Sequence, residues 1–399
     1  MKSLSRKALA IEPSQTLALF ARAKAMKAEG HDVVSFTAGE PDFPTPTPVK
    51  EAGISAINEN FTKYTPTRGM PELLKAIAEK FRKENGIETE PGRILVSSGA
   101  KHSIFNALQA MCNRGDEVVI PSPYWVSYPE MVQMVDARPV LVRTSLKNQF
   151  KMTASQLKRA ITRKAKAVIL NSPCNPTGAV YSREEIEAIA EIVRMSGVYL
   201  ISDEIYERIL FDREQHFSPG SIAAIRDQVI TVNGVSKAYS MTGWRIGFMT
   251  GHKSVIDIAE TFQGQVTSSA NSVAQKAALA ALTGNLNGIV HAMVAEFDRR
   301  RVYLTERFRE IPETRYVLPK GAFYLFFDAS AYLGKRMDNM AIKTADDLCE
   351  FLLTRYNVAL VPGTGFGEKR WIRLSYACSM EDLKKGIERI REGLQRLRQ

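Results

Sequence analysis

Between Arg93 and Gly251 the chain alternates short apolar runs, rich in β-branched residues, with stretches of helical periodicity. This alternation is typical of βαβ units, in which helices cover a largely parallel sheet. The predicted strands are 94–98, 117–121, 139–142, 167–171, 198–202, 228–232 and 245–250. The sequence therefore predicts an α/β fold with a mostly parallel sheet of seven strands.

Helical stripes surround these strands. From Ser182 to Met195 apolar side chains recur on one face, as expected of a helix that covers a sheet. A further helix is expected from Pro71 to about Asn85, because proline suits a first helical position and Gly86 suits the position after the end.

The last third of the chain has a different pattern, which predicts a smaller α+β domain. It contains helical stretches at 292–309 and 380–399 and strand candidates at 322–327, 358–361 and 371–376. The four prolines between Gly39 and Pro48 exclude a regular helix or a central strand there. We expect an N-terminal arm that joins the small domain, a large domain and a C-terminal small domain, at 1–45, 46–290 and 291–399.

Composition excludes several classes of protein. Apolar residues make up 45% and charged residues 24% of the 399 residues, as in folded soluble enzymes. The net charge of +11 favours anionic ligands or nucleic acid. The four cysteines are widely separated and the five histidines have no metal-binding spacing, so we expect no metal site and a reducing, cytoplasmic location. The sequence shows neither a secretory signal nor an uninterrupted apolar stretch of about 18 residues, so we expect no membrane association.

A single lysine, Lys237, follows the predicted strand 228–232 among small and hydroxyl-bearing residues. Desolvation at such a place would lower its pKa and make it a candidate Schiff-base nucleophile and proton shuttle. The alternative is a solvated loop lysine, which is the general preference of this residue type.

Strand 198–202 delivers Asp203 and Tyr206 at its carboxyl end, where open α/β sheets bind ligands. A carboxylate there can pair with a protonated ring nitrogen, and a phenol can donate to a phenolate oxygen. The alternative for Asp203 is a helix N-cap without a catalytic role.

Two turns complete the candidate site. The rigid turn from Asn171 to Gly178 presents Asn175, although turn chemistry alone explains its prolines and glycine. After strand 94–98, Gly99 and Ala100 open a helix and expose backbone N–H groups that could hold a phosphate. Small residues are also common at such turns without any ligand.

In this order the segments resemble the class I aminotransferases of the pyridoxal-phosphate enzymes, most closely the bacterial aspartate aminotransferases of the thermophile-type branch. The resemblance covers nearly the whole chain, from Phe36-Thr-Ala-Gly-Glu-Pro-Asp-Phe43 to Arg373-Leu-Ser-Tyr-Ala377. It implies fold type I and a ping-pong transfer of the amino group from L-aspartate to 2-oxoglutarate, giving oxaloacetate and L-glutamate. Some enzymes of this branch also aminate prephenate.

The resemblance also assigns contacts to pyridoxal 5′-phosphate. Lys237 is expected to form the Schiff base and, once freed by substrate, to carry the proton between the substrate Cα and the cofactor. Asp203 is expected to keep the pyridine nitrogen protonated. The remaining expected ring contacts are Tyr206 and Asn175, at the ring oxygen, and Trp125, which stacks on the ring face.

For the cofactor phosphate, the resemblance implies the backbone N–H groups of Gly99 and Ala100, the hydroxyl of Ser236 and the guanidinium of Arg245. Tyr64 is expected to reach this phosphate from a neighbouring subunit. A homodimer with shared active sites follows.

For the substrate, Arg373 is expected to hold the α-carboxylate through two parallel hydrogen bonds, with a backbone N–H from Gly39. Lys101 matches the lysine that receives the distal carboxylate of a dicarboxylic substrate, assisted by Thr16. Trp125 and Asn175 are expected to face the substrate as well as the cofactor. In a departure from the family pattern, His102 replaces the glutamine expected after that lysine.

Three alternatives stay open at this point. Within the family, the chain could be an aromatic or broad-range aminotransferase, and the shared cofactor residues also allow a β-elimination lyase. From another class, the same fold occurs in transcription regulators fused to winged-helix domains. Only about 35 residues precede the Phe36 motif, too few for such a domain, so we expect no nucleic-acid partner.

Overall fold

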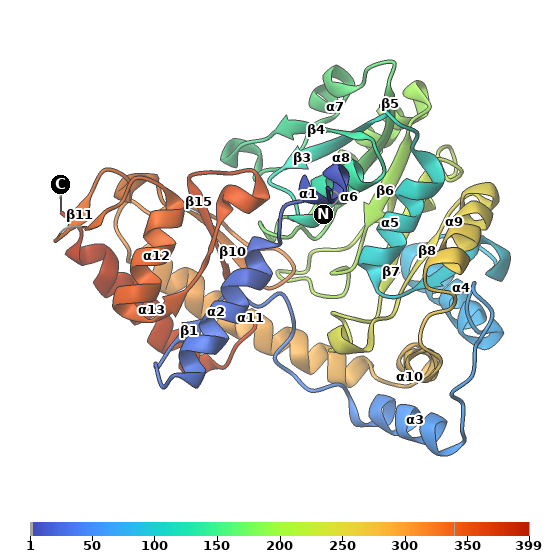
Figure 1. Cartoon of the computed structure of the whole chain (residues 1–399), viewed down its shortest axis with the longest axis horizontal. Coiled ribbons are helices and arrows are strands. Elements are labelled where there is room, and N and C mark those ends of the chain that lie inside the picture. Colours follow the sequence, from blue (N-terminus) through green and yellow to red (C-terminus); the bar gives the residue numbers. More distant parts are fainter. Residues whose placement is uncertain (1–2, 339, 399) are drawn as a thin grey trace.

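The computed structural model describes residues 3–338 and 340–398, and a sheet of seven strands forms the middle of its right-hand part in Figure 1. All of the predicted strands are present, in the spatial order β2-β8-β7-β6-β5-β3-β4. β8 runs antiparallel to both β2 and β7, and the other pairs are parallel. The strands are β2 (Ile94–Ser97), β3 (Glu117–Ser122), β4 (Arg138–Arg143), β5 (Ala165–Asn171), β6 (Tyr199–Asp203), β7 (Val229–Gly234) and β8 (Gly247–Thr250).

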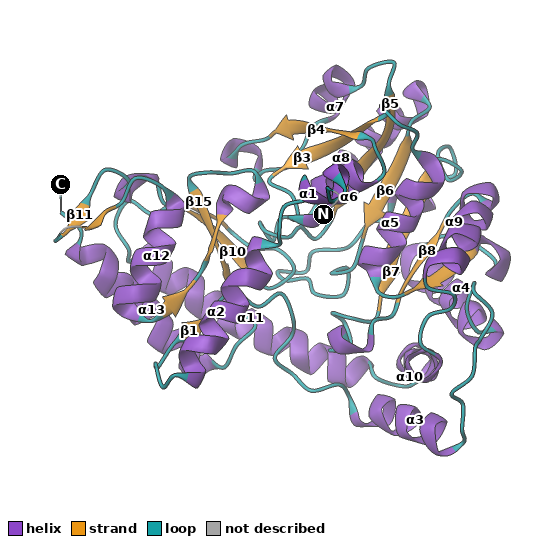
Figure 2. Ribbon diagram, in the orientation of Figure 1, coloured by secondary structure: helices purple, strands orange, loops and turns teal. Residues whose placement is uncertain are grey.

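Helices cover both faces of this sheet (Figure 2). On one face, strand residues such as Ile169 and Ile201 share a core with α5 (Ala100–Met111), α6 (Ser127–Met134) and α9 (Lys253–Val266). On the other, Val168 and Leu200 share a core with α7 (Ala154–Ala160) and α8 (Arg183–Ser196). Double coverage explains why the central strands are apolar runs with no polar alternation.

The two helices predicted from their end signals are confirmed. Ser182 caps α8 and forms a capping box with Glu185, and Gly197 ends the helix in the left-handed region, at φ +70°. Pro71 occupies the first position of α4 (Pro71–Asn85), and Gly86 ends it at φ +65°.

A second, antiparallel sheet in the order β14-β15-β10-β9 forms the centre of the α+β part. It packs in one core with three helices, α11 (Asn287–Arg309), α12 (Ala345–Tyr356) and α13 (Met380–Arg396). The strands are β9 (Tyr316–Val317), β10 (Tyr324–Asp328), β14 (Val361–Pro362) and β15 (Trp371–Ser375), and a separate pair is formed by β11 (Arg336–Met337) and β12 (Met340–Ala341).

Several predicted boundaries in this part are wrong. The run 358–361 is two strands, because β13 (Val358–Ala359) pairs with β1 (Val34–Ser35) while β14 pairs with β15. β10 starts two residues later than predicted, because Ala322 has a left-handed φ of +57°. Helix α11 starts five residues early, at Asn287, since the buried Val290 extends its apolar face. The last helix ends at Arg396, and Gln399 lies outside the described residues.

The N-terminal segment contacts both parts of the molecule: Lys7 pairs with Asp136, and the backbone N–H of Glu12 donates to Glu130 of α6. Helix α2 (Gln15–Ala28) contacts β13 and β14, and α1 (Arg6–Leu9) precedes it. The proline-rich segment is irregular as far as Pro46, but Thr47 and Pro48 open α3 (Thr47–Asn58), a first-turn position that tolerates proline. α3 packs on α10 (Ser272–Thr283) beside the large sheet.

Among the described residues no single helix is long and apolar enough to cross a membrane, although α10 and α11, bent by 87°, pass the length and composition test as a pair.

Candidate active site

A cavity of about 300 Å³ opens at the carboxyl ends of the central strands and reaches the second sheet. The structure brings most of the predicted site residues to its wall. They are Thr16, Gly39, Ala100, Lys101, Trp125, Asn175, Asp203, Tyr206, Ser236, Lys237, Arg245 and Arg373. Of the other two, Gly99 adjoins the cavity at the start of α5, whereas Tyr64 does not line it.

Lys237 follows β7 and is half-buried at the cavity wall, where its Nζ donates to the carbonyl oxygen of Gly39. Burial, reinforced by Arg245, lowers the pKa of Lys237 to about 8, against an opposing effect of Glu40. The place of Lys237 on the cavity wall and its hydrogen bond to Gly39 contradict the alternative of a solvated loop lysine. An amine with this pKa is substantially neutral near pH 8 and can act as a nucleophile.

Asp203 stands at the end of β6 with 4% of its surface exposed. Burial raises its pKa to about 6, while hydrogen bonds from Tyr128 and the backbone N–H of Ile205 lower it. The chain continues into a turn instead of an α-helix, so the N-cap interpretation of Asp203 is wrong. A buried acid that faces a cavity can pair with a cationic ring nitrogen.

Tyr206 and Arg373 meet across the two sheets through Tyr324 of β10. The hydroxyls of Tyr206 and Tyr324 lie 2.7 Å apart, and the Arg373 guanidinium carbon lies 4.6 Å from the centre of the Tyr324 ring. Arg373 donates to Asn175 Oδ1 (3.0 Å) and to the carbonyl oxygen of Thr37 (2.8 Å). Its buried Nε has no hydrogen-bond partner within the part of the chain that the structure describes.

The start of α5 forms a tight cradle. Gly99 has a φ of +89°, and a Cβ at this position would lie 2.4 Å from Arg245 Nη2. A Cβ at Gly247 would lie 2.1 Å from the backbone nitrogen of Ala100. This close backbone approach places the positive end of α5 beside a guanidinium, which suits an anion.

Lys101 and Thr16 also line the cavity. Lys101 Nζ is 4.8 Å from the centre of the Trp125 ring. Burial, and then the charge of Arg245, lowers the pKa of Lys101, although the side chain remains partly exposed. Thr16, on α2, lies within 3.0 Å of Ser14 through their hydroxyls. His102, the departure from the family pattern, does not line the cavity.

Sequence reasoning assigned no role to Tyr128 or Tyr324, although the resemblance extends over the stretches 121–129 and 319–324 that contain them. It also assigned none to Glu40, which lines the cavity and accepts a 2.7 Å hydrogen bond from Thr242. The motifs were the available signal, but the partners of these residues depend on the tertiary fold.

The cavity suits a flat aromatic cofactor that carries a phosphate. The cradle and Arg245 would take the phosphate, the amine of Lys237 would face a carbonyl group, and Asp203 would face a ring nitrogen. The cation of Arg245 would thus meet the anionic phosphate, and the acid of Asp203 would meet the protonated ring nitrogen.

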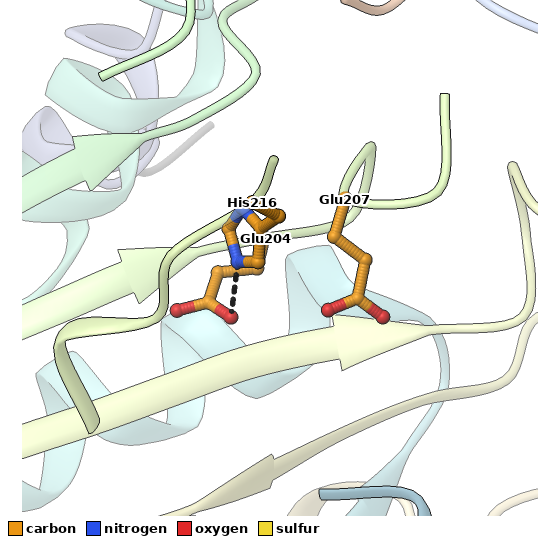
Figure 3. Close-up of side chains that lie close together, drawn as sticks. All are labelled: Glu204, Glu207 and His216. Atoms are coloured by element: carbon orange, nitrogen blue, oxygen red, sulfur yellow. Dashed lines mark hydrogen bonds and ion pairs between the residues drawn. The ribbon is translucent and has the colours of Figure 1, made fainter. Parts of the chain in front are cut away.

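Figure 3 shows three side chains of metal-ligating type that lie close together, none of which lines this cavity. One ligand atom each of Glu204, Glu207 and His216 lies within 4.8 Å of the others. Lys80 forms an ion pair with Glu207, and His216 Nε2 lies 2.8 Å from Glu204 Oε2. Three further donors hold the carboxylates, namely Asn85, Ser202 and Ser218. The Lys80 ammonium pairs with Glu207 and the His216 imidazole with Glu204, so the group is an ion-pair network.

We expect His216→Asn to destabilise the protein by about 1–3 kcal/mol at low pH and by less at high pH. Burial lowers the pKa of His216, but Glu204 and Glu207 raise it more, so the folded-state pKa is raised. The stabilisation by the imidazolium is therefore complete below the unfolded pKa of about 6.5 and is lost as pH rises through the folded pKa.

Urea unfolding of wild type and variant at several pH values between 6 and 9 measures this difference, with the exposed His31→Asn as the matched control. A loss of unfolding free energy that is the same at every pH would contradict the ion-pair interpretation.

Comparisons with known proteins agree with the resemblance drawn from the motifs. The family described as aminotransferase class I and II matches residues 31–390. A bifunctional aspartate aminotransferase and glutamate/aspartate-prephenate aminotransferase of Petunia hybrida is 47% identical over 98% of this chain and 83% of its own length.

Solved structures give the same result for the fold. The aspartate aminotransferase of Rhizobium meliloti superposes with a TM-score of 0.96 at 40% identity, over the full length of both chains. The aspartate aminotransferase of Thermus thermophilus with maleate superposes with a TM-score of 0.93 at 43% identity, over 98% of this chain and 100% of its own length. The predicted fold type is confirmed, and the chain belongs to the class I and II aminotransferases.

Proposed function

We propose that the protein is an aspartate aminotransferase that binds pyridoxal 5′-phosphate and transfers the amino group of L-aspartate to 2-oxoglutarate, giving oxaloacetate and L-glutamate. The observation that carries the proposal is one cavity that joins Lys237 and Asp203 to two cationic side chains, Lys101 and Arg373. The family and the names of the related enzymes support the same activity. When bound, the cofactor supplies an electron sink for the charge that develops at the substrate Cα.

In this proposal the residues at the cofactor end each have one task. Lys237 binds the cofactor covalently and moves the proton at the substrate Cα, and Asp203 holds the proton on the ring nitrogen. Tyr206 and Asn175 hydrogen-bond the ring oxygen, and Trp125 stacks on the ring. The phosphate is held by Gly99, Ala100, Ser236 and Arg245.

At the substrate end, Arg373 and the backbone N–H of Gly39 bind the α-carboxylate, while Lys101 and Thr16 bind the distal carboxylate. The presence of two cationic side chains at one cavity favours a dicarboxylic substrate. The related Thermus protein is described with maleate, itself a dicarboxylate. The name of the Petunia relative extends the proposal to prephenate as a second acceptor.

We further propose two domains, with 46–290 forming the large cofactor domain and 1–45 joining 291–399 in the small domain. Pairing of β1 with β13 and the packing of α2 on β14 support this division. Substrate carboxylates that bridge Arg373 and Lys101 would draw the domains together and expel water.

We propose a homodimer in which Tyr64 of one subunit reaches the cofactor phosphate of the other. Tyr64 is 91% exposed and lies outside its own cavity. Ile54 and Ile57 of α3 are each 56% exposed, so this helix presents an apolar surface of the kind that subunit contacts bury. Four free cysteines accord with a cytoplasmic location.

The visible spectrum of the protein loaded with pyridoxal phosphate tests the function. L-aspartate is expected to bleach the yellow band, and 2-oxoglutarate or prephenate is expected to restore it. A band that ignores aspartate but bleaches with phenylalanine would replace the aspartate assignment by an aromatic one. A protein that takes up no cofactor would contradict the proposal.

The Lys101→Ser variant tests the distal-carboxylate contact. We expect the KM for aspartate to rise about 10–100-fold, because a charge-assisted hydrogen bond to that carboxylate is lost. The KM for phenylalanine, which lacks this carboxylate, is the internal control and should stay within about twofold. Equal effects on both donors would contradict the role of Lys101.

A further inference from the structure

Asp203 is held by a tyrosine for which the proposed function has given no task. Tyr128, on α6, is 2% exposed, and its hydroxyl donates to Asp203 Oδ2 over 2.6 Å. The other oxygen, Oδ1, accepts the backbone N–H of Ile205 over 3.2 Å. Of these two donors only the tyrosine hydroxyl can be removed by substitution.

The hydrogen bond favours the charged form of the acid. Burial raises the pKa of Asp203 to about 6, and the bond from Tyr128 is the largest of the effects that lower it. Burial and the charge of Asp203 raise the pKa of Tyr128 well above its usual range, so the phenol remains the donor. Without this donor, a desolvated carboxylate would take up a proton more readily.

Tyr128 also contacts Trp125, whose ring is proposed to stack on the cofactor. The Trp125 and Tyr128 rings meet edge to face, with centres 5.3 Å apart and planes at 82°. The backbone N–H of Tyr128 donates to the Trp125 carbonyl oxygen over 3.0 Å. One turn at the start of α6 therefore places both the donor to Asp203 and the tryptophan.

We propose that Tyr128 is a positioning residue that keeps the Asp203 carboxylate ionised and aimed at the cavity, where it pairs with the ring nitrogen of the cofactor. This inference rests on the proposed function, since it concerns the same site. It assigns to α6 a share in cofactor chemistry, although its tyrosine acts only through Asp203.

The test compares the affinities of the cofactor-free protein for pyridoxal phosphate and for its analogue in which C–H replaces the ring nitrogen. Only the first can pair with Asp203, so the ratio of the two dissociation constants reports on that contact. Tyr128→Phe keeps the ring and its contact with Trp125, and we expect it to reduce the preference for pyridoxal phosphate about tenfold.

Tyr181→Phe is the matched control, because this tyrosine is also buried but its hydroxyl accepts the Met152 N–H (2.7 Å) and, among the described residues, makes no hydrogen bond to the Asp203 carboxylate. The ratio of the two dissociation constants for Tyr181→Phe should equal that of wild type. In an Asp203→Asn background, Tyr128→Phe should leave the ratio unchanged. A Tyr128→Phe ratio within twofold of wild type would overturn the inference, whereas a wild-type protein that binds neither compound would overturn the proposed function.

A second replacement covers the case in which the phenylalanine variant does not fold. 3,5-Difluorotyrosine at position 128 keeps the shape of the ring and carries a more acidic, stronger donor. We expect its preference for pyridoxal phosphate to equal or exceed that of wild type, and a tenfold fall would overturn the inference.

Discussion

Lys237→Ala is expected to lower kcat for aspartate transamination by about 10⁴-fold, the upper range for loss of a positioned acid–base group. The amine of Lys237 is the one proposed both to bind the cofactor and to move the proton at the substrate Cα. Burial has already lowered its pKa to about 8, so water cannot replace it with equal effect. Steady-state kinetics measures the loss.

A second readout separates loss of the amine from loss of the fold. Borohydride reduction should attach pyridoxal phosphate irreversibly to the wild-type protein and leave the variant unlabelled. Lys253→Ala is the matched control, because this lysine is 61% exposed and pairs with Asp257 on the surface. Retention of more than about one hundredth of wild-type kcat in Lys237→Ala would contradict the assignment.

Arg373→Lys should lower kcat/KM for aspartate by about 10²–10³-fold, although the charge is conserved. The guanidinium of Arg373 donates to Asn175 and to the Thr37 carbonyl oxygen and lies over the Tyr324 ring. Lysine has no planar fork, so it cannot bind both oxygens of a carboxylate in parallel. It would also leave buried acceptors without donors.

The dissociation constant of a dicarboxylate inhibitor, measured by the change in the cofactor spectrum, should rise in parallel with the fall in kcat/KM. Arg370→Lys, an exposed change three residues away in the chain, is the control and should behave as wild type. A change below about threefold in kcat/KM for Arg373→Lys would exclude a bidentate contact.

The large sheet could be predicted because its strands are buried on both faces and therefore read as continuous apolar runs. Such runs do not encode strand direction, and the antiparallel course of β8 came only from the structure. The run 358–361 shows a similar limit, because its division into β13 and β14 depends on which neighbours each half meets.

Site residues at strand ends could be predicted because local motifs carry them. Tyr128 and Tyr324 could not be assigned roles, since their hydroxyls meet Asp203 and Tyr206 across 75 and 118 positions of chain. The effect of burial on Lys237 likewise depends on Gly39 and Arg373, which other elements bring to the cavity. Contacts between distant segments depend on the fold and cannot be deduced from a single sequence.

Helix α11 restricts the movements available to the molecule. Its Val290 belongs to the core beside the large sheet and its Phe297 to the core around the second sheet, so one rigid rod is anchored in both. The segment around Asp42 and Phe43, which leads from the N-terminal arm into the proposed large domain, is attached to the same helix. Asp42 accepts a hydrogen bond from Arg300 (2.7 Å), and the Phe43 and Phe297 rings meet edge to face. In the proposed division into two domains, these contacts fix both connections to one helix, which favours a swing of the domains about α11 over sliding of one domain past the other.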